Sequence, residues 1–187
     1  MIHLLKYENE YDWILQVKGD FVAFAVAGEA HDYVEETSIR MRQLARKLFH
    51  FPFYLTFESY YDMQAYILKE EGLNIRYKPS GRTVLTQISH KSFQAEVPSF
   101  TVEIPNEQTL NIVFENWFNY AFDNHLWALI QDDTVTYENG FAAVELKKNE
   151  TILVTEHDAS GFTLITNQLS LQNEQGLLLV LKDAYIE

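Results

Sequence analysis

The pattern of apolar and polar residues is clearest between Asn106 and Asn124, where it predicts a helix. Pro105 favours an extended conformation for the residue before it, so a preceding strand is expected to end there. Asn106 is a favourable N-cap because its side-chain oxygen can accept a hydrogen bond from a free amide of the first turn. Apolar residues cover an arc of about 200° around this helix, against about 100° for an ordinary surface helix. We therefore expect the helix to be covered on more than one side and to form much of the core.

Two further helices are predicted earlier in the chain. Between Ala30 and Phe49, apolar residues recur at spacings of three and four. Acidic residues lie early in this segment and basic residues late, an order that complements the helix dipole. Ser59, followed by Asp62 three residues later, resembles a capping box and predicts a helix that continues through Lys69.

Much of the remaining chain is expected to be β-structure. Turn signals at residues 18–20, 79–81 and 157–161 predict three hairpins, and Asn139-Gly140 is a further strong turn signal. The expected strands are residues 2–6, 11–17, 21–27, 53–57, 74–78, 82–88, 93–97, 100–104, 126–130, 135–137, 141–146, 151–156, 162–166 and 177–181. Strands outnumber helices and strict β–α alternation is absent. These features predict an α+β fold of largely antiparallel sheets packed against about three helices.

Length and composition limit the class of protein. With 187 residues, the chain is expected to form a single α+β domain over residues 1–187. It contains no cysteine, which excludes a disulfide framework and thiolate chemistry. The first residues lack a signal-peptide pattern, and no apolar run approaches the about 20 residues of a membrane helix. We expect a soluble, cytoplasmic protein of a bacterium or phage, with no membrane association.

Charge is distributed unevenly along the chain. Residues 1–100 hold 13 acidic and 11 basic residues, a net charge of −2, whereas residues 101–187 hold 14 acidic and 3 basic residues, a net charge of −11. A near-neutral half is thus followed by a strongly acidic half. A surface of one sign steers association with a partner of the opposite sign, although it also serves simply to keep a protein soluble. Direct nucleic-acid binding through the acidic half is disfavoured, because phosphates require Lys and Arg.

Five acidic residues in expected loops and strand ends are the candidate contacts with a basic protein partner, because loops commonly carry binding residues. They are Asp132, Asp133, Glu138, Glu156 and Asp158. In composition, the small, acidic, cysteine-free and aromatic-rich chain is similar to many bacterial immunity proteins and phage-encoded inhibitors. That likeness rests on no motif and therefore assigns no residue a role.

Catalytic and cofactor motifs are not found in the sequence. The seven glycines form no phosphate-binding loop, no nucleophile elbow occurs, and the six histidines show no metal-ligand spacing. We therefore assign no catalytic residue, metal or cofactor. Active sites assembled from distant residues leave no local motif. His125 and His157 are the candidate acid–base groups if the protein is an enzyme.

Three functions are compatible with these features. The favoured one is a non-catalytic protein-binding factor, of the inhibitor or immunity type, which uses an acidic surface. The alternative is a small-molecule-binding domain or hydrolase-like enzyme with an aromatic-lined pocket near residues 106–124, because Tyr and Trp supply apolar walls with polar tips. The third is an oligomerising module that uses the wide apolar arc of that helix. The sequence itself sets no oligomeric state.

Overall fold

A computed structural model describes residues 4–8, 13–27 and 31–184. The helices are α1 (Tyr33–Leu48), α2 (Gln64–Ile67), α3 (Glu107–Trp117), α4 (Asn119–Phe122) and α5 (Glu174–Ala184), with a short 3₁₀ helix, η1, at His157–Ala159. The strands are β1 (Leu4–Glu8), β2 (Leu15–Lys18), β3 (Val22–Ala27), β4 (Phe53–Glu58), β5 (Ile75–Ile88), β6 (Lys91–Ile104), β7 (Trp127–Ile130), β8 (Thr136–Glu138), β9 (Phe141–Glu145), β10 (Thr151–Thr155) and β11 (Gly161–Thr166).

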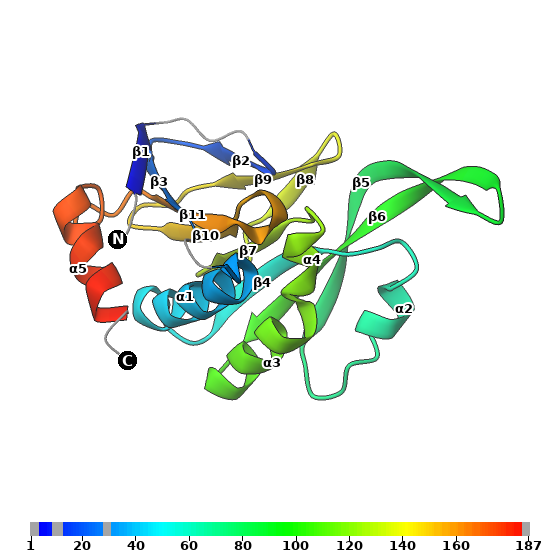
Figure 1. Cartoon of the computed structure of the whole chain (residues 1–187), viewed down its shortest axis with the longest axis horizontal. Coiled ribbons are helices and arrows are strands. Elements are labelled where there is room, and N and C mark those ends of the chain that lie inside the picture. Colours follow the sequence, from blue (N-terminus) through cyan, green and yellow to red (C-terminus); the bar gives the residue numbers. More distant parts are fainter. Residues whose placement is uncertain (1–3, 9–12, 28–30, 185–187) are drawn as a thin grey trace.

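The fold consists of an eight-stranded sheet between a layer of helices and a smaller sheet (Figure 1). The large sheet has the order β1-β3-β11-β10-β7-β4-β6-β5, and every neighbouring pair in it is antiparallel. The small sheet has the order β2-β9-β8, in which β2 and β9 are parallel. The α+β class and the largely antiparallel sheets agree with the prediction.

Each face of the large sheet has its own apolar core. Strand β7 shows the division clearly, because side chains alternate between the two faces of a strand. Trp127 and Leu129 pack on the helix side, whereas Ala128 and Ile130 pack against the small sheet. All four β7 residues are buried, which explains why the sequence of this strand is an unbroken apolar run and does not alternate between apolar and polar residues.

The central helix is confirmed, with a break. Asn106 caps α3 by accepting a hydrogen bond from Thr109 N at 3.0 Å, as the sequence predicts. The helix ends at Trp117, and the short helix α4 follows after Phe118. Aromatic residues of both helices lie in the core on the helix side of the large sheet. The helix predicted for residues 30–49 is confirmed as α1, although Ala30 lies outside the described residues.

Three predictions of secondary structure were wrong, two in the first half of the chain and one near its C-terminal end. Residues 11–17 and 21–27 were expected to form one hairpin, but β2 pairs with β9 and β3 pairs with β1 and β11. Residues 177–181 were expected to be a strand but lie in helix α5, because a short apolar run fits either structure. The helix expected through Lys69 is reduced to the single turn of α2. Residues 2–3 and 11–12 of the predicted strands lie outside the described residues.

The hairpin expected around residues 79–81 was also placed wrongly. Strands β5 and β6 are 14 residues each, and they join through Ser89 and His90, which both have positive φ (46° and 67°). Two such residues make the two-residue turn that suits a twisted hairpin. The Pro79-Ser80-Gly81 segment is a register shift within β5. Beyond this shift, residues 83–96 form a projecting ribbon that we call the arm (Figure 1).

Candidate functional site

Two of the predicted contact acids are engaged within the chain at the end of β7. The carboxylate of Asp132 lies 2.6 Å from Lys147 Nζ. Asp133 pairs with Arg76 at 2.8 Å and accepts a hydrogen bond from Lys78. Both basic residues that bind Asp133 come from β5, in the near-neutral half of the chain. Their charges compensate the acidic loop locally, a compensation that sequence order does not reveal.

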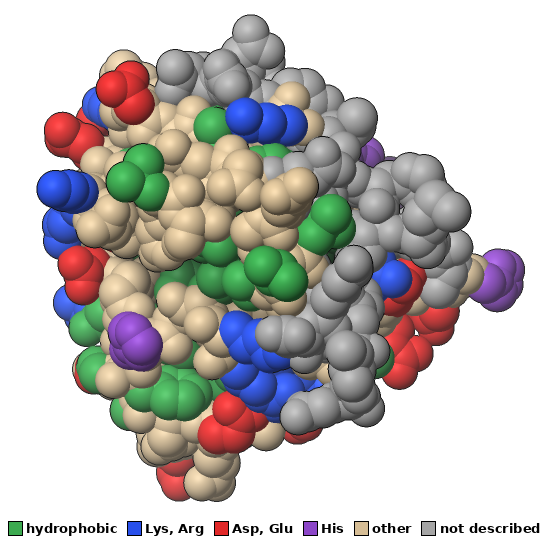
Figure 2. All heavy atoms as spheres, turned by 90° about the vertical axis from the view of Figure 1, so that its left-hand side faces the viewer, with side chains coloured by type: hydrophobic (Ala, Val, Ile, Leu, Met, Phe, Trp, Pro, Cys, Tyr) green, Lys and Arg blue, Asp and Glu red, His purple; other side chains and the backbone are tan. Residues whose placement is uncertain are grey.

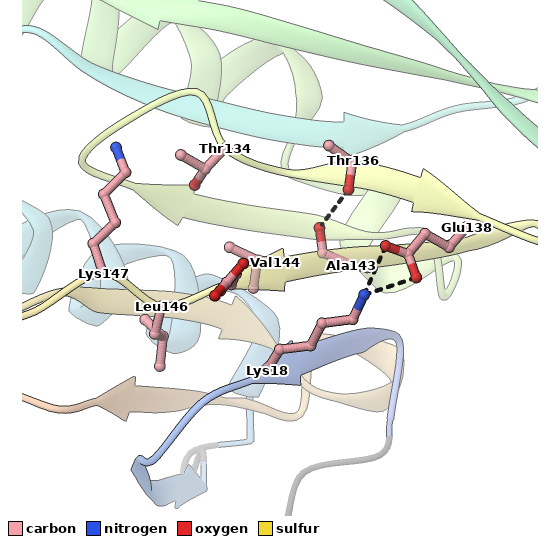
Figure 3. Close-up of a pocket in the computed structure, with 9 residues that line it drawn as sticks. Lys18, Thr134, Thr136, Glu138, Ala143, Val144, Leu146 and Lys147 are labelled. Atoms are coloured by element: carbon pink, nitrogen blue, oxygen red, sulfur yellow. Dashed lines mark hydrogen bonds and ion pairs between the residues drawn. The ribbon is translucent and has the colours of Figure 1, made fainter.

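The third predicted acid, Glu138, lines an open pocket on the small sheet. Lys18 Nζ donates to both carboxylate oxygens of Glu138, at 2.7 and 2.8 Å, across that sheet (Figure 3). The pocket has a volume of about 400 Å³. It is lined by Lys18, Thr134, Thr136, Glu138, Ala143, Val144, Glu145, Leu146 and Lys147. Acidic and basic groups are mixed in this lining, so the pocket presents no field of one sign.

The last two predicted acids have structural partners near η1. Glu156 accepts a hydrogen bond from Thr163, and burial raises the pKa of its carboxyl. Asp158 Oδ1 accepts a hydrogen bond from Asn124 Nδ2 at 2.8 Å, and Asp158 N donates to Asn124 Oδ1 at 2.8 Å. These two bonds fasten η1 to the loop that precedes β7. His157 Nδ1 lies 2.8 Å from Asp158 Oδ2 on the exposed side.

The five predicted acids are not gathered on one surface. Strands β7 and β10 are antiparallel, with Ile130 opposite Ile152. Asp132 and Asp133 follow the end of β7 at which Ile130 lies, whereas Glu156 and Asp158 follow the opposite end of β10. At the α5 end of the molecule, Figure 2 shows acidic and basic side chains side by side. The excess of acid in the second half of the sequence is therefore partly balanced in space.

A second pocket, of about 460 Å³, lies between the end of α1, the start of β10 and α5. Its lining includes Lys47, Leu48, Phe49, His50, Gln131, Asn149, Glu150, Thr151, Gln168, Ser170, Leu171 and Val180. Gln131 fixes one wall, because it accepts from His50 N and donates to His50 O and Pro52 O, each at 2.9 Å. Neither this pocket nor the one on the small sheet is lined by His125 or His157.

A buried polar cluster connects the two sheets with the base of the arm. Glu58 is 2% exposed and forms a salt bridge with Arg82. Tyr137 of the small sheet approaches both Glu58 Oε1 at 3.1 Å and Ser99 Oγ at 2.7 Å through its hydroxyl. Leu126 N donates to Glu58 Oε2 at 3.3 Å. Because both carboxylate oxygens have partners inside the fold, the cluster holds the layers together rather than presenting a free base.

His125 adjoins this cluster and is held in its neutral form. Burial lowers the pKa of His125 from 6.5 to about 4, and the positive charge of Arg82 acts in the same direction. The Nδ1 atom is buried without a hydrogen-bond partner among the described residues. With its pKa lowered in this way, the imidazole is in its neutral form at neutral pH.

The depressed pKa of His125 predicts a dependence of stability on pH. The unfolded chain binds a proton at His125 more readily than the folded chain, so this residue makes stability fall as pH drops from about 6.5 to about 4. Glu150 and Glu156 have raised pKa values and act in the opposite direction. Urea unfolding of wild type and of His125→Gln between pH 4 and 7 isolates the His125 effect, because the two glutamates are common to both proteins. The free energy of unfolding of wild type is expected to fall more steeply on acidification than that of His125→Gln. Equal pH dependence of the two proteins would contradict this.

Exposed tyrosines and carboxylates gather around Tyr120, where the α2 segment meets α4. Tyr120 is buried, and burial is the main reason why the pKa of its hydroxyl is raised. Asp62, Tyr66 and Asp123 lie close enough to Tyr120 to raise that pKa further. Tyr60 lies edge-on to Tyr120, with ring centroids 5.8 Å apart. Burial and a hydrogen bond with Asp123 raise the pKa of Tyr60 to about 12. We call Tyr60, Asp62, Tyr66 and Asp123 the tyrosine–acid patch.

The tyrosine–acid patch differs from the predicted acidic loops in having uncompensated charge. Tyr60 and Tyr66 are 43% and 67% exposed. Among the described residues, neither Asp62 nor Asp123 forms a salt bridge with Lys or Arg. The sequence carried a partial signal for this surface, since the Ser59–Tyr61 stretch is rich in tyrosine. It gave no sign that Asp123, some 60 residues later, lies beside it.

Comparison with known proteins assigns no relative. None of the helices in the described part of the chain is long and apolar enough to cross a membrane. Models of known protein families, curated proteins and solved structures give no match to this chain.

Proposed function

We propose that the protein is a non-catalytic binding factor that meets a basic protein partner through the tyrosine–acid patch. The observation that carries this proposal is the pair of exposed tyrosines beside two carboxylates that have no salt bridge among the described residues. Tyrosine is enriched at binding hot spots, since its ring supplies contact area and its hydroxyl a polar end. Tyrosine faces and carboxylates both attract Lys and Arg.

The net charge of the whole chain favours the same kind of partner. A charge of −13 attracts a basic protein over distance, even where individual acids are paired locally. The patch then supplies the close contacts that long-range attraction alone does not. Asp132, Asp133, Glu138, Glu156 and Asp158 remain the second candidate contact set, although each has a partner inside the chain.

Loss of Tyr66 is expected to weaken partner binding by about tenfold or more, the effect of removing a moderate hot spot. Partners are captured from a lysate of the source cells on the immobilised protein, washed at low and then high salt, and identified by mass spectrometry. The dissociation constant of the identified protein is then measured with wild type, Tyr66→Ala and Asp123→Asn. Asp123→Asn is expected to slow association and to reduce its salt dependence.

Matched variants locate the contact surface. Phe141→Ala removes another aromatic side chain, 57% exposed on β9, and is expected to leave affinity unchanged. The pair Asp132→Asn and Glu138→Gln tests the loop acids. Binding that responds to these two substitutions and not to those in the patch would move the contact to the loops. Failure to retain any basic protein would overturn the function itself.

The small-molecule alternative has one observation in its favour, the pocket between α1 and α5. Its volume lies within the range of ligand sites, and Glu150 in its wall is 5% exposed. The aromatic-lined pocket expected beside α3 has less support, because Trp117 and Tyr120 fill the core instead. A screen of metabolites by thermal shift, with Glu150→Gln as the comparison, tests this second candidate.

A further inference from the structure

Strand β5 has one edge that does not pair with β6. The first half of this edge is protected against pairing with another strand, and the second half is open. Pro79 lies in the first half, and proline is a common means of blocking an edge strand. The Asn139-Gly140 turn covers the next stretch, where a Cβ on Gly140 would lie 3.4 Å from Arg82 Cα. Residues 83–88 that follow contain no proline and no charged residue. In the described part of the chain, β5 pairs with β6 alone.

The hairpin register shows which backbone groups of the arm are already bonded. In a hairpin closed by a two-residue turn, the residues that flank the turn exchange both backbone hydrogen bonds. Here these residues are Ile88 and Lys91. Every second residue back along β5 also bonds to β6, so Thr86 and Val84 use their backbone groups within the hairpin. The residues between them direct theirs away from β6.

The outward groups belong to Thr83, Leu85 and Gln87. We propose that two copies of this chain pair along these residues, antiparallel, around a two-fold axis at Leu85. Leu85 then faces the partner's Leu85, and Thr83 faces the partner's Gln87. Each of the three facing pairs exchanges two bonds, which gives about six backbone hydrogen bonds across the axis.

The side chains of the arm suit a second copy better than a charged partner. Leu85 is 71% exposed, and pairing places it against an identical leucine. On the other face, Val84 meets the partner's Thr86, a combination that suits a β-sheet. Residues that lie near a two-fold axis approach their own copies, so an axis at a charged surface brings like charges together, and a chain with a net charge of −13 offers few uncharged surfaces. The arm contains one Lys and one Glu, Lys91 and Glu96, and both lie on β6, so the pairing residues 83–87 of β5 avoid this repulsion.

Cross-linking tests both the contact and its register, because the chain contains no other cysteine. Oxidation of Leu85→Cys is expected to give a disulfide-linked dimer, since facing residues in an antiparallel pair lie within disulfide range. Gln87→Cys is the control on the same strand. In this register its two copies are four residues apart along the strand, roughly 13 Å, which is too far for a disulfide. Equal cross-linking of the two variants would overturn the register.

Sedimentation equilibrium tests association without oxidation. Wild type is expected to dimerise reversibly, and Leu85→Lys to raise the dissociation constant at least about tenfold by placing two ammonium groups at the axis. Leu169→Lys, at a residue 78% exposed elsewhere, is the charge-matched control and is expected to dimerise as wild type does. A wild-type monomer at roughly 200 μM, or a dimer that Leu85→Lys leaves intact, would overturn the proposal. Tyr66→Ala is expected to leave the dimer unchanged, so failure of this proposal is distinguishable from failure of partner binding.

Discussion

Trp117→Ala is expected to lower the free energy of unfolding by about 3–5 kcal/mol, the cost of deleting a large buried aromatic side chain. Trp117 is 3% exposed and stacks on Phe57 with ring centroids 5.0 Å apart. Phe57 in turn contacts Phe100 and Tyr120, so the cavity would open where β4, β6, α3 and α4 meet. Rings held from several elements close only partly over such a cavity. Typical domains are stable by about 5–15 kcal/mol, so the loss is a large share.

Urea unfolding followed by far-ultraviolet circular dichroism measures this cost. Phe122→Ala is the control, because Phe122 is an aromatic residue of the adjacent helix α4 but is 47% exposed. Its loss is expected to cost less than about 1 kcal/mol. Similar costs for the two variants would show that the Trp117 ring is not the centre of the core.

The central helix was predictable because its signals are local and agree with one another. Asn106 supplies a cap, and the wide apolar arc requires cover on more than one side. The structure supplies that cover through the large sheet and helix α1. Where one segment carries consistent capping and periodicity, tertiary contacts reinforce the local preference instead of overriding it.

The sequence did not predict the arm, because the two residues of its turn are weak turn formers. Pro79-Ser80-Gly81 has stronger turn chemistry than Ser89-His90, which contains neither glycine nor asparagine. Gly81 instead has a φ of 67° within β5, in the left-handed region that favours glycine. The glycine that the local pattern assigns to a turn thus lies in the register shift between Pro79 and Thr83.

The candidate site was harder to predict than the fold, since charge compensation is a long-range property. Lys18, Arg76 and Lys78 come from the near-neutral half and pair with acids of the acidic half. Linear counting therefore overstates the acidity of the loops around Asp132 and Asp133. No local pattern marks acids that lack such partners, so the tyrosine–acid patch emerged only from the fold.

Glu58→Ala is expected to cost about 3 kcal/mol of stability, because removal of this buried carboxylate leaves its partners without an acceptor. Arg82 would lose its counter-ion, and Tyr137 and Leu126 N would lose hydrogen bonds. Glu58→Gln keeps a carbonyl acceptor but not the charge, so its cost is expected to be smaller. Urea unfolding measures both variants against wild type.

A double-mutant cycle measures the interaction energy between Glu58 and Arg82 separately from their contacts with other residues. Arg82→Ala leaves the Glu58 carboxylate, which is buried, without its cation, whereas the double variant Glu58→Ala/Arg82→Ala leaves neither charge. The double variant is therefore expected to cost less than the sum of the two single variants. Because Arg82 lies at the base of the arm, amide hydrogen exchange in residues 83–96 is expected to accelerate in all three variants. Exchange in β10 and β11 is expected to change only as far as global stability is lost. Additive costs and unchanged arm exchange would show that the cluster neither couples the two charges nor anchors the arm to the sheet.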